Sequence, residues 1–226
     1  MSQTYSSLIL GNITPKQQEH KVSLQQALKK YLPPAVVELS AELIMYYKLH
    51  LHIEVERRDR YCDYHPHMGK GNMITVNHNL NPYEFLVTFI HELAHHTTFL
   101  KHGNKVDHHG AEWKSEFRNN MKPFLLLDGA FPDDVKLAVI KHMKSPKYSH
   151  SADVNLTKIL MKYDKVKDYI TLDELPYGAL FKMSNRAKIV MKKLEKLRTY
   201  TMCISVSDGK MYKVHTLAKV IPIQTT

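Results

Sequence analysis

Five consecutive residues near the middle of the chain, His91-Glu92-Leu93-Ala94-His95, have the spacing of a metal-binding helix. Residues four apart lie on one face of a helix, so His91 and His95 can direct two imidazole nitrogens at one ion. Zinc accepts such nitrogens at about 2.0–2.1 Å and lowers the pKa of bound water to about 7. Glu92 can take the released proton, and the hydroxide can then attack a peptide carbonyl. The alternative is an exposed helix face that is rich in histidine, since the chain contains 15.

A catalytic zinc needs a third protein ligand and an open position. The candidates downstream of the motif are all histidines: His96, His102, His108 and His109. On a helix, His96 points about 100° away from His95, and His102 lies about 10.5 Å further along the axis. Gly103 breaks the helix and lets the chain return, which favours His108 or His109. The spacing does not choose between these two.

The helix that carries the motif has clear start and stop signals. Asn81 is a good N-cap, Pro82 suits the first helical position, and Glu84 follows at the third. Gly103 is a suitable C-cap, so the predicted helix runs from 82 to about 102. One apolar face is predicted for it, and His91 and His95 fall nearly opposite that face. Its members are Leu86, Phe89, Ile90, Leu93 and Thr97.

The remaining patterns predict an α+β protein in two parts. Residues 1–145 contain a capped helix start at Thr14-Pro15, strands near 51–55 and 74–76, and further helices after Gly110 and Pro132. Residues 146–175 are predicted as a linker with a short helical segment. Residues 176–226 are predicted as a small β domain, in which Asp208-Gly209 marks a two-residue hairpin. Its expected strands are 179–183, 188–192, 200–206 and 211–215.

The pair of motifs His91-Glu-Leu-Ala-His95 and His109-Gly110-Ala111-Glu112-Trp113 resembles the SprT-like metalloprotease family. That family has HExxH followed by His-Gly-x-x-Trp/Phe, with the histidine before glycine as third ligand, which implies His109 rather than His108. The resemblance covers about residues 35–122 and implies a zincin-like fold. It also implies one catalytic zinc held by His91, His95 and His109, with Glu92 as general base and proteins as substrates.

The cysteine content departs from the family pattern. Many SprT-like proteins carry a four-cysteine zinc ribbon after the protease domain, whereas Cys203 is the only cysteine in that part of this chain. A metal-free β module is therefore expected in its place. Cys62 and Cys203 cannot form a disulfide framework, and a reducing cytoplasm is the expected compartment. Cys62 is expected to be an inert thiol, and the His65-Pro66-His67 segment a polar loop rather than a second metal site.

Positive charge is concentrated at the C-terminal end. The chain has 32 Lys and Arg against 22 Asp and Glu, and residues 176–226 alone hold ten positive and two negative side chains. This surplus favours a polyanionic partner such as nucleic acid. Aromatic residues in the same segment can stack on bases, although a solvated charged face over core aromatics is the alternative. These residues are Tyr177, Phe181, Tyr200 and Tyr212.

The HExxH motif and the resemblance together predict a zinc endopeptidase. Spartan, a SprT-like protein, is a DNA-dependent protease that acts on proteins crosslinked to DNA, which implies a similar role in DNA repair. The rivals are a quality-control protease without a nucleic-acid role, and a non-catalytic nucleic-acid-binding protein with structural zinc. Intact Glu92 argues against the second rival. No apolar run approaches the roughly 18 residues of a membrane span, so no membrane association is expected.

Overall fold

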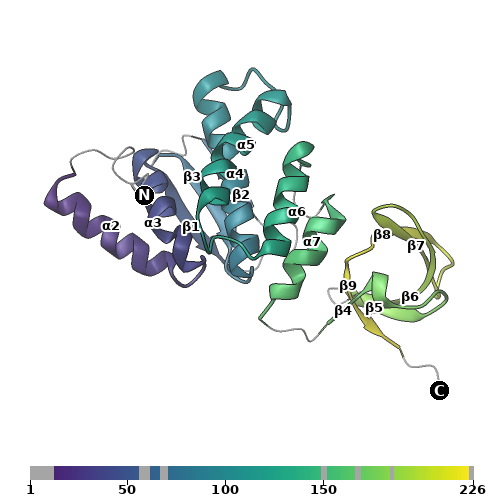
Figure 1. Ribbon diagram of the computed structural model, residues 1–226. Coiled ribbons are helices and arrows are strands. Elements are labelled where there is room, and N and C mark those ends of the chain that lie inside the picture. The colour runs from purple at the N-terminus through teal and green to yellow at the C-terminus, as the bar shows by residue number, and fades with distance from the viewer. Residues whose placement is uncertain are drawn as a thin grey trace. The chain divides into compact units, whose positions relative to one another are not determined.

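The computed structural model describes residues 13–55, 62–66, 71–148, 152–165, 169–183 and 186–223. The chain forms two compact units, Met1–Tyr163 and Asp164–Thr226. It has mixed α and β structure with two separate sheets (Figure 1). This division lies inside the segment predicted as a linker, so the short helix of that segment belongs to the first unit.

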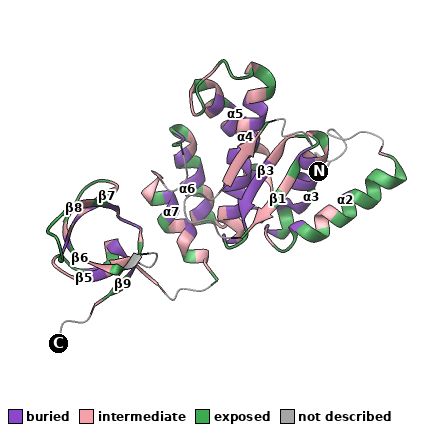
Figure 2. Ribbon diagram, turned by 180° about the vertical axis from the view of Figure 1, so that it is seen from behind, coloured by how far each residue is buried: buried purple, intermediate pink, exposed green. Residues whose placement is uncertain are grey.

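The first unit begins with two helices that lead into a small sheet. Helix α2 (Pro15–Leu28) starts at Thr14, where the Thr14 side chain and Gln17 form a capping box. A 3-10 turn, η1 (Pro34–Val36), precedes α3 (Val37–Tyr46). Figure 2 shows α2 mostly exposed and α3 more deeply buried.

The sheet of the first unit has three strands in the order β1-β3-β2. Strand β1 (His50–Glu54) pairs parallel to β3 (Met73–Asn77), and β2 (Cys62–His65) pairs antiparallel to β3 on its other side. The segment His65-Pro66-His67 was predicted as a polar loop, which is wrong for His65, because it is the last residue of β2. Because β3 has strands on both sides, it supplies the buried centre of the sheet.

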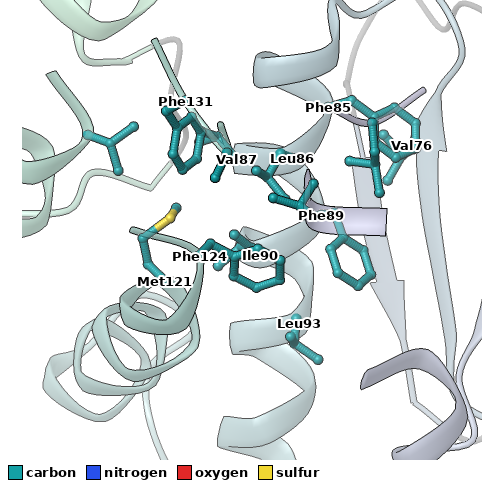
Figure 3. Packing of buried hydrophobic residues seen from close by; sticks show 14 of the residues in the cluster. Val76, Phe85, Leu86, Val87, Phe89, Ile90, Leu93, Met121, Phe124 and Phe131 are labelled. Atoms are coloured by element: carbon teal, nitrogen blue, oxygen red, sulfur yellow. The ribbon is translucent and has the colours of Figure 1, made fainter. Parts of the chain in front are cut away.

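Helix α4 (Pro82–His102) forms the centre of the first unit. Its Asn81 cap is confirmed, since Asn81 Oδ1 accepts hydrogen bonds from the backbone N–H groups of Tyr83 and Glu84. The helix packs against β2 and β3 on one side and α5 (Ala111–Leu126) on another. Figure 3 shows α4 side chains extending toward Val76 of the sheet and toward Met121 and Phe124 of α5.

Burial on nearly all sides makes α4 a core helix rather than a helix with a single apolar face. Thirteen of its residues are buried, and the predicted apolar stripe is only part of that set. The buried residues are Phe85, Leu86, Val87, Thr88, Phe89, Ile90, His91, Glu92, Leu93, Ala94, His96, Thr97 and Thr98.

Two more helices complete the first unit. Helix α6 (Asp133–Lys144) follows Pro132, and α7 (Val154–Leu160) starts at Asp153, whose side chain accepts from the N–H of Leu156. The short turn η3 (Met161–Tyr163) ends the unit. The Asn81 side chain donates to the carbonyl of Leu160 at 2.9 Å, so the cap of α4 also holds the end of α7.

The second unit is a curved six-stranded sheet with the order β4-β9-β5-β6-β7-β8 (Figure 1). Strand β4 (Ile170–Thr171) leads into the turn η4 (Leu172–Glu174). The sheet encloses a small core of buried residues that is separate from that of the first unit. The longer strands are β5 (Leu180–Met183), β6 (Arg186–Lys196), β7 (Tyr200–Ser205), β8 (Met211–His215) and β9 (Lys219–Pro222).

The predicted β character of the C-terminal segment is confirmed, with three differences. Strand β6 is longer than predicted, β4 and β9 were not predicted, and the β7–β8 hairpin has a loop longer than two residues. The last ladder pair is Ile204 with Met211, and Gly209 takes the positive φ of 67° inside that loop. Every helix of the described residues is too short or too polar to cross a membrane.

Candidate metal centre

Helix α4 supplies three of the four predicted site residues. His91 and His95 stand one helical turn apart on α4, and Glu92 lies beside His91. His91 is 8% exposed and Glu92 is 3% exposed, so the motif is not on an open helix face. Because α4 is buried on several sides, the packing around it holds these side chains in place.

A tight turn brings the fourth residue back to α4. The helix ends at Gly103 with φ 60°, and the chain returns before α5 starts after Gly110. The N–H of Gly110 donates to the carbonyl of Asp107 at 3.0 Å. A Cβ atom on Gly110 would lie 3.1 Å from Asp107 Cβ and 3.2 Å from Asp107 O, so the turn leaves almost no room for a side chain. This turn places His109 immediately before α5.

The three predicted ligands meet through their Nε2 atoms. The distance from His95 Nε2 to His91 Nε2 is 3.2 Å, and to His109 Nε2 it is 3.1 Å. The third distance, from His109 Nε2 to His91 Nε2, is 3.2 Å. Among the described residues, this is the one group of three or more metal-ligating side chains close enough to share an ion. The group can hold a metal ion.

The size of this triangle fits a tetrahedral metal. Nitrogens bound at about 2.05 Å with tetrahedral angles lie about 3.3 Å apart, close to the separations of 3.1–3.2 Å seen here. Each Nε2 atom offers one N–H or one lone pair, so three such atoms in mutual contact cannot satisfy one another by hydrogen bonding. A cation that accepts three lone pairs resolves this conflict.

The protein environment keeps two of these imidazoles neutral. Burial lowers the pKa of His95 to about 3, and the nearby His109 and His108 rings act in the same direction. Burial also lowers the pKa of His109 to about 4, together with His108 and Lys114. A neutral imidazole has a lone pair available at neutral pH, so a metal need not displace a proton from these two rings.

Glu92 lies next to the metal-ligand group without belonging to it. Its Oε1 atom is 4.0 Å from His91 Nε2. Among the described residues, the side chains close enough to share one ion are the three histidines, and Glu92 is not among them. The carboxylate thus lies beside the three-histidine group, where the motif predicts a proton acceptor.

The other histidines near the motif have different surroundings. His96 is fully buried, and its Nδ1 atom lies 3.1 Å from the Tyr64 hydroxyl on β2. His102 ends α4, and His108 is exposed with its ring 6.2 Å from that of His95. None of the three belongs to the metal-ligand group of the described residues.

The remaining sequence candidates lie on or near β2. Cys62 and His65 are both half-buried residues of that strand, and Cys62 is a free cysteine. His65 is 4.0 Å from Asp63, and neither residue joins a metal-ligand group among the described residues. The predicted partner of His65, His67, lies outside the described residues.

The contact between Tyr64 and His96 was not predicted from the sequence. The Tyr64 hydroxyl donates to Asn72 Oδ1 at 3.2 Å, so its oxygen is left to accept the Nδ1–H of His96. Burial raises the pKa of Tyr64 to about 12, so the phenol stays protonated. No sequence signal marks this pair, because 32 positions separate the two residues.

Comparisons of the chain with protein-family models, with curated proteins and with solved structures find no significant match.

Proposed function

We propose that this chain is a zinc-dependent metalloendopeptidase whose first unit is a SprT-like domain with a zincin-like fold. The observation that carries the proposal is the convergence of His91, His95 and His109 through Nε2, with the Glu92 carboxylate 4.0 Å from His91. A purely structural metal site has no need of that carboxylate. Zinc is the proposed metal because it favours three imidazole ligands with a fourth position open.

In this proposal the chain's own residues have separate tasks. The three histidines hold the metal, which when bound supplies a Lewis acid that polarises a peptide carbonyl and acidifies water. Glu92 takes a proton from the attacking water and passes it to the amine that leaves. Its burial favours this role, because a carboxylate with little competing solvent interacts more strongly with a nearby proton donor.

The decisive experiment compares Glu92→Gln with wild type. The variant should bind zinc in a 1:1 ratio and keep its fold, because the substitution removes a base and not a ligand. Cleavage of an unfolded protein substrate should fall by about 100-fold or more. Glu84→Gln is the matched control, since it makes the same change in the first turn of the same helix and should retain activity. Wild-type cleavage by zinc-loaded Glu92→Gln would refute the mechanism.

We further propose that the substrates are DNA-associated or DNA-crosslinked proteins and that the second unit binds DNA. One face of its sheet favours this. In the sheet register Leu180 pairs with Lys192 and Lys192 with Ile204, while Met202 pairs with Lys213. Paired residues point to the same side, and alternation along each strand adds further residues to that side. The lysines that the β5–β8 ladders place on this outer face are Lys182, Lys188, Lys192 and Lys213.

The opposite side of the same strands is the core, where Phe181 and Met191 are buried. Several other basic residues of the unit already have intramolecular partners. The Lys193 ammonium donates to backbone carbonyls of Asp173 and Leu175, and Lys196 pairs with the Asp173 carboxylate. The four outer lysines are therefore the better candidates for phosphate contacts.

DNA binding is tested by gel shift at increasing salt. Each phosphate contact adds about 0.9 to the slope of log K against log salt. Reversing Lys188, Lys192 and Lys213 to Glu should weaken binding and lower that slope by about 3. The same reversal at Lys16, Lys29 and Lys30, which are exposed on or just after α2, is the control.

Absence of wild-type binding at low salt would leave the quality-control protease as the better account. For either substrate class, a reducing compartment such as the cytoplasm suits the two free cysteines.

A further inference from the structure

Trp113 is the only tryptophan of the chain and contacts all three candidate metal ligands. Its ring centroid lies 4.7 Å from that of His91, 5.3 Å from His95 and 4.7 Å from His109. It is fully buried in the first turn of α5, four residues after His109. A single side chain thus forms a common supporting surface for imidazoles that come from two different segments.

The indole is itself held from behind. Phe117, one turn further along α5, stacks on Trp113 with centroids 5.4 Å apart and ring planes 22° apart. The Phe117 ring contacts the His142 ring of α6 at 5.7 Å, and His142 Nδ1 lies 3.0 Å from Asp153 Oδ2. This chain of contacts fixes Trp113 against two other helices, so its position does not depend on the metal ligands alone.

Hydrogen bonding does not explain a tryptophan at this position. The buried Nε1 atom of Trp113 has no hydrogen-bond partner among the described residues, which carries a desolvation cost. Phenylalanine would avoid that cost. Tryptophan has a larger ring than phenylalanine. Here the centroid of that ring lies within the 4.5–7 Å range of aromatic contacts from three imidazole rings.

We propose that Trp113 is a positioning residue that orients His91, His95 and His109 for metal binding before the metal arrives. Packing against one rigid ring limits the rotation of each imidazole, so less conformational entropy is lost when the ion binds. Trp113 therefore sets metal affinity without touching the metal. The inference rests on the metal site of the proposed function and not on its peptidase activity.

The first test measures zinc affinity by competition with a chromogenic chelator. Trp113→Leu should weaken zinc binding by about 10–100-fold, the usual effect of losing a residue that orients a ligand. Trp113→Phe keeps a smaller ring and should lose less than about tenfold. The matched control is Phe124→Leu, at a fully buried aromatic residue of the same helix without a ring contact to the three histidines among the described residues.

Equal losses of affinity in Trp113→Leu and Phe124→Leu would overturn the inference, because general destabilisation would then explain both. Unchanged affinity in Trp113→Leu would also overturn it. Since no peptide is used, a wild-type protein that binds zinc but cleaves nothing would reject the peptidase and leave this inference standing.

A second test uses the wild-type chain and so does not depend on how variants fold. Trp113 is the sole tryptophan, and Cu²⁺ and Co²⁺ quench indole fluorescence at short range. Titration with Cu²⁺ should quench the emission with 1:1 stoichiometry, and zinc should compete with the quenching. Emission that is unchanged at full metal occupancy would contradict contact between Trp113 and the metal ligands.

Discussion

The Nε2 atom of His109 lies 3.1 Å from the Nε2 atom of His95, although the two residues are 14 positions apart in the chain. His108, its direct neighbour, is exposed, with its ring 6.2 Å from that of His95. Adjacent residues in a turn point in different directions, so only one of the two can join the group on α4. The geometry of this turn therefore distinguishes His109 from His108, which the spacing of the two residues in the sequence could not do.

Replacing each of these histidines should therefore have very different effects. His109→Ala should lower zinc affinity by more than the 10–100-fold typical of residues that only support a ligand. His108→Ala, its matched control, should bind one zinc per chain with nearly wild-type affinity. Metal analysis after dialysis and competitive titration with a chelator measure both. Loss of zinc from His108→Ala together with retention by His109→Ala would reverse the assignment.

Removing the metal should destabilise the first unit. A ligand that binds only the folded state adds about 2.7 kcal/mol to the free energy of unfolding when its free concentration is 100 times Kd. Zinc should therefore raise the denaturation midpoint of wild type, and a chelator should reverse the increase. Calorimetry with and without zinc checks this, and His109→Ala should show no such increase. An equal zinc effect in His109→Ala would place the stabilising metal elsewhere.

The local signals of the sequence were reliable because their physics is local. The Thr14 capping box, the Asn81 cap and the Gly103 break each depend on backbone groups within four residues, and all three are present in the structure. The HExxH spacing likewise requires only a helix. These signals were enough to predict α4 and two residues of the three-histidine group.

The missed elements depend on distant partners. Strand β9 pairs with β4 and β5, and β4 has only two residues, so neither has a periodic pattern of its own. Helix α7 belongs to the first unit partly because the Asn81 side chain binds Leu160, 79 positions away. Trp113 was visible as part of a motif, but its contact with three histidines arises only when α5 packs on α4.

The turn before α5 provides a test of how the third ligand is positioned. In Gly110→Ala the new Cβ atom would lie 3.1 Å from Asp107 Cβ and 3.2 Å from Asp107 O, closer than a normal contact. Relief of this contact requires a shift of a few tenths of an ångström in the turn, which we expect to displace His109. We expect zinc affinity to fall by about tenfold or more, as for other changes in residues that orient a ligand. The far-ultraviolet circular dichroism should stay unchanged.

A second substitution makes this test specific. Asp107→Gly removes the Cβ atom on the other side of the close contact, so the double variant Asp107→Gly/Gly110→Ala should recover part of the lost affinity. Independent effects of the two changes would instead simply add. Additive losses, or full affinity in Gly110→Ala, would show that the turn is not what positions His109.

The contact between His142 and Asp153, which lies behind Phe117 and Trp113, should make the stability of the protein depend on pH in the acid range. A hydrogen bond with His142 lowers the pKa of Asp153, and backbone donors at the start of α7 act in the same direction against the effect of burial. The unfolded pKa of an aspartate is about 3.9. A group whose pKa is lower in the folded state stabilises the protein above that value, and the stabilisation disappears as pH falls through the folded pKa.

As the pH falls below about 4, the free energy of unfolding of the wild type should therefore decrease, in part because Asp153 becomes protonated. Asp153→Asn keeps an oxygen that can cap α7 but carries no charge, so its stability should fall less steeply over the same range. Urea denaturation at a series of pH values, followed through Trp113 fluorescence, measures both proteins. Asp128→Asn, at an exposed residue of the first unit, is the control and should follow wild type. Parallel pH profiles for wild type and Asp153→Asn would show that the carboxylate does not contribute to stability.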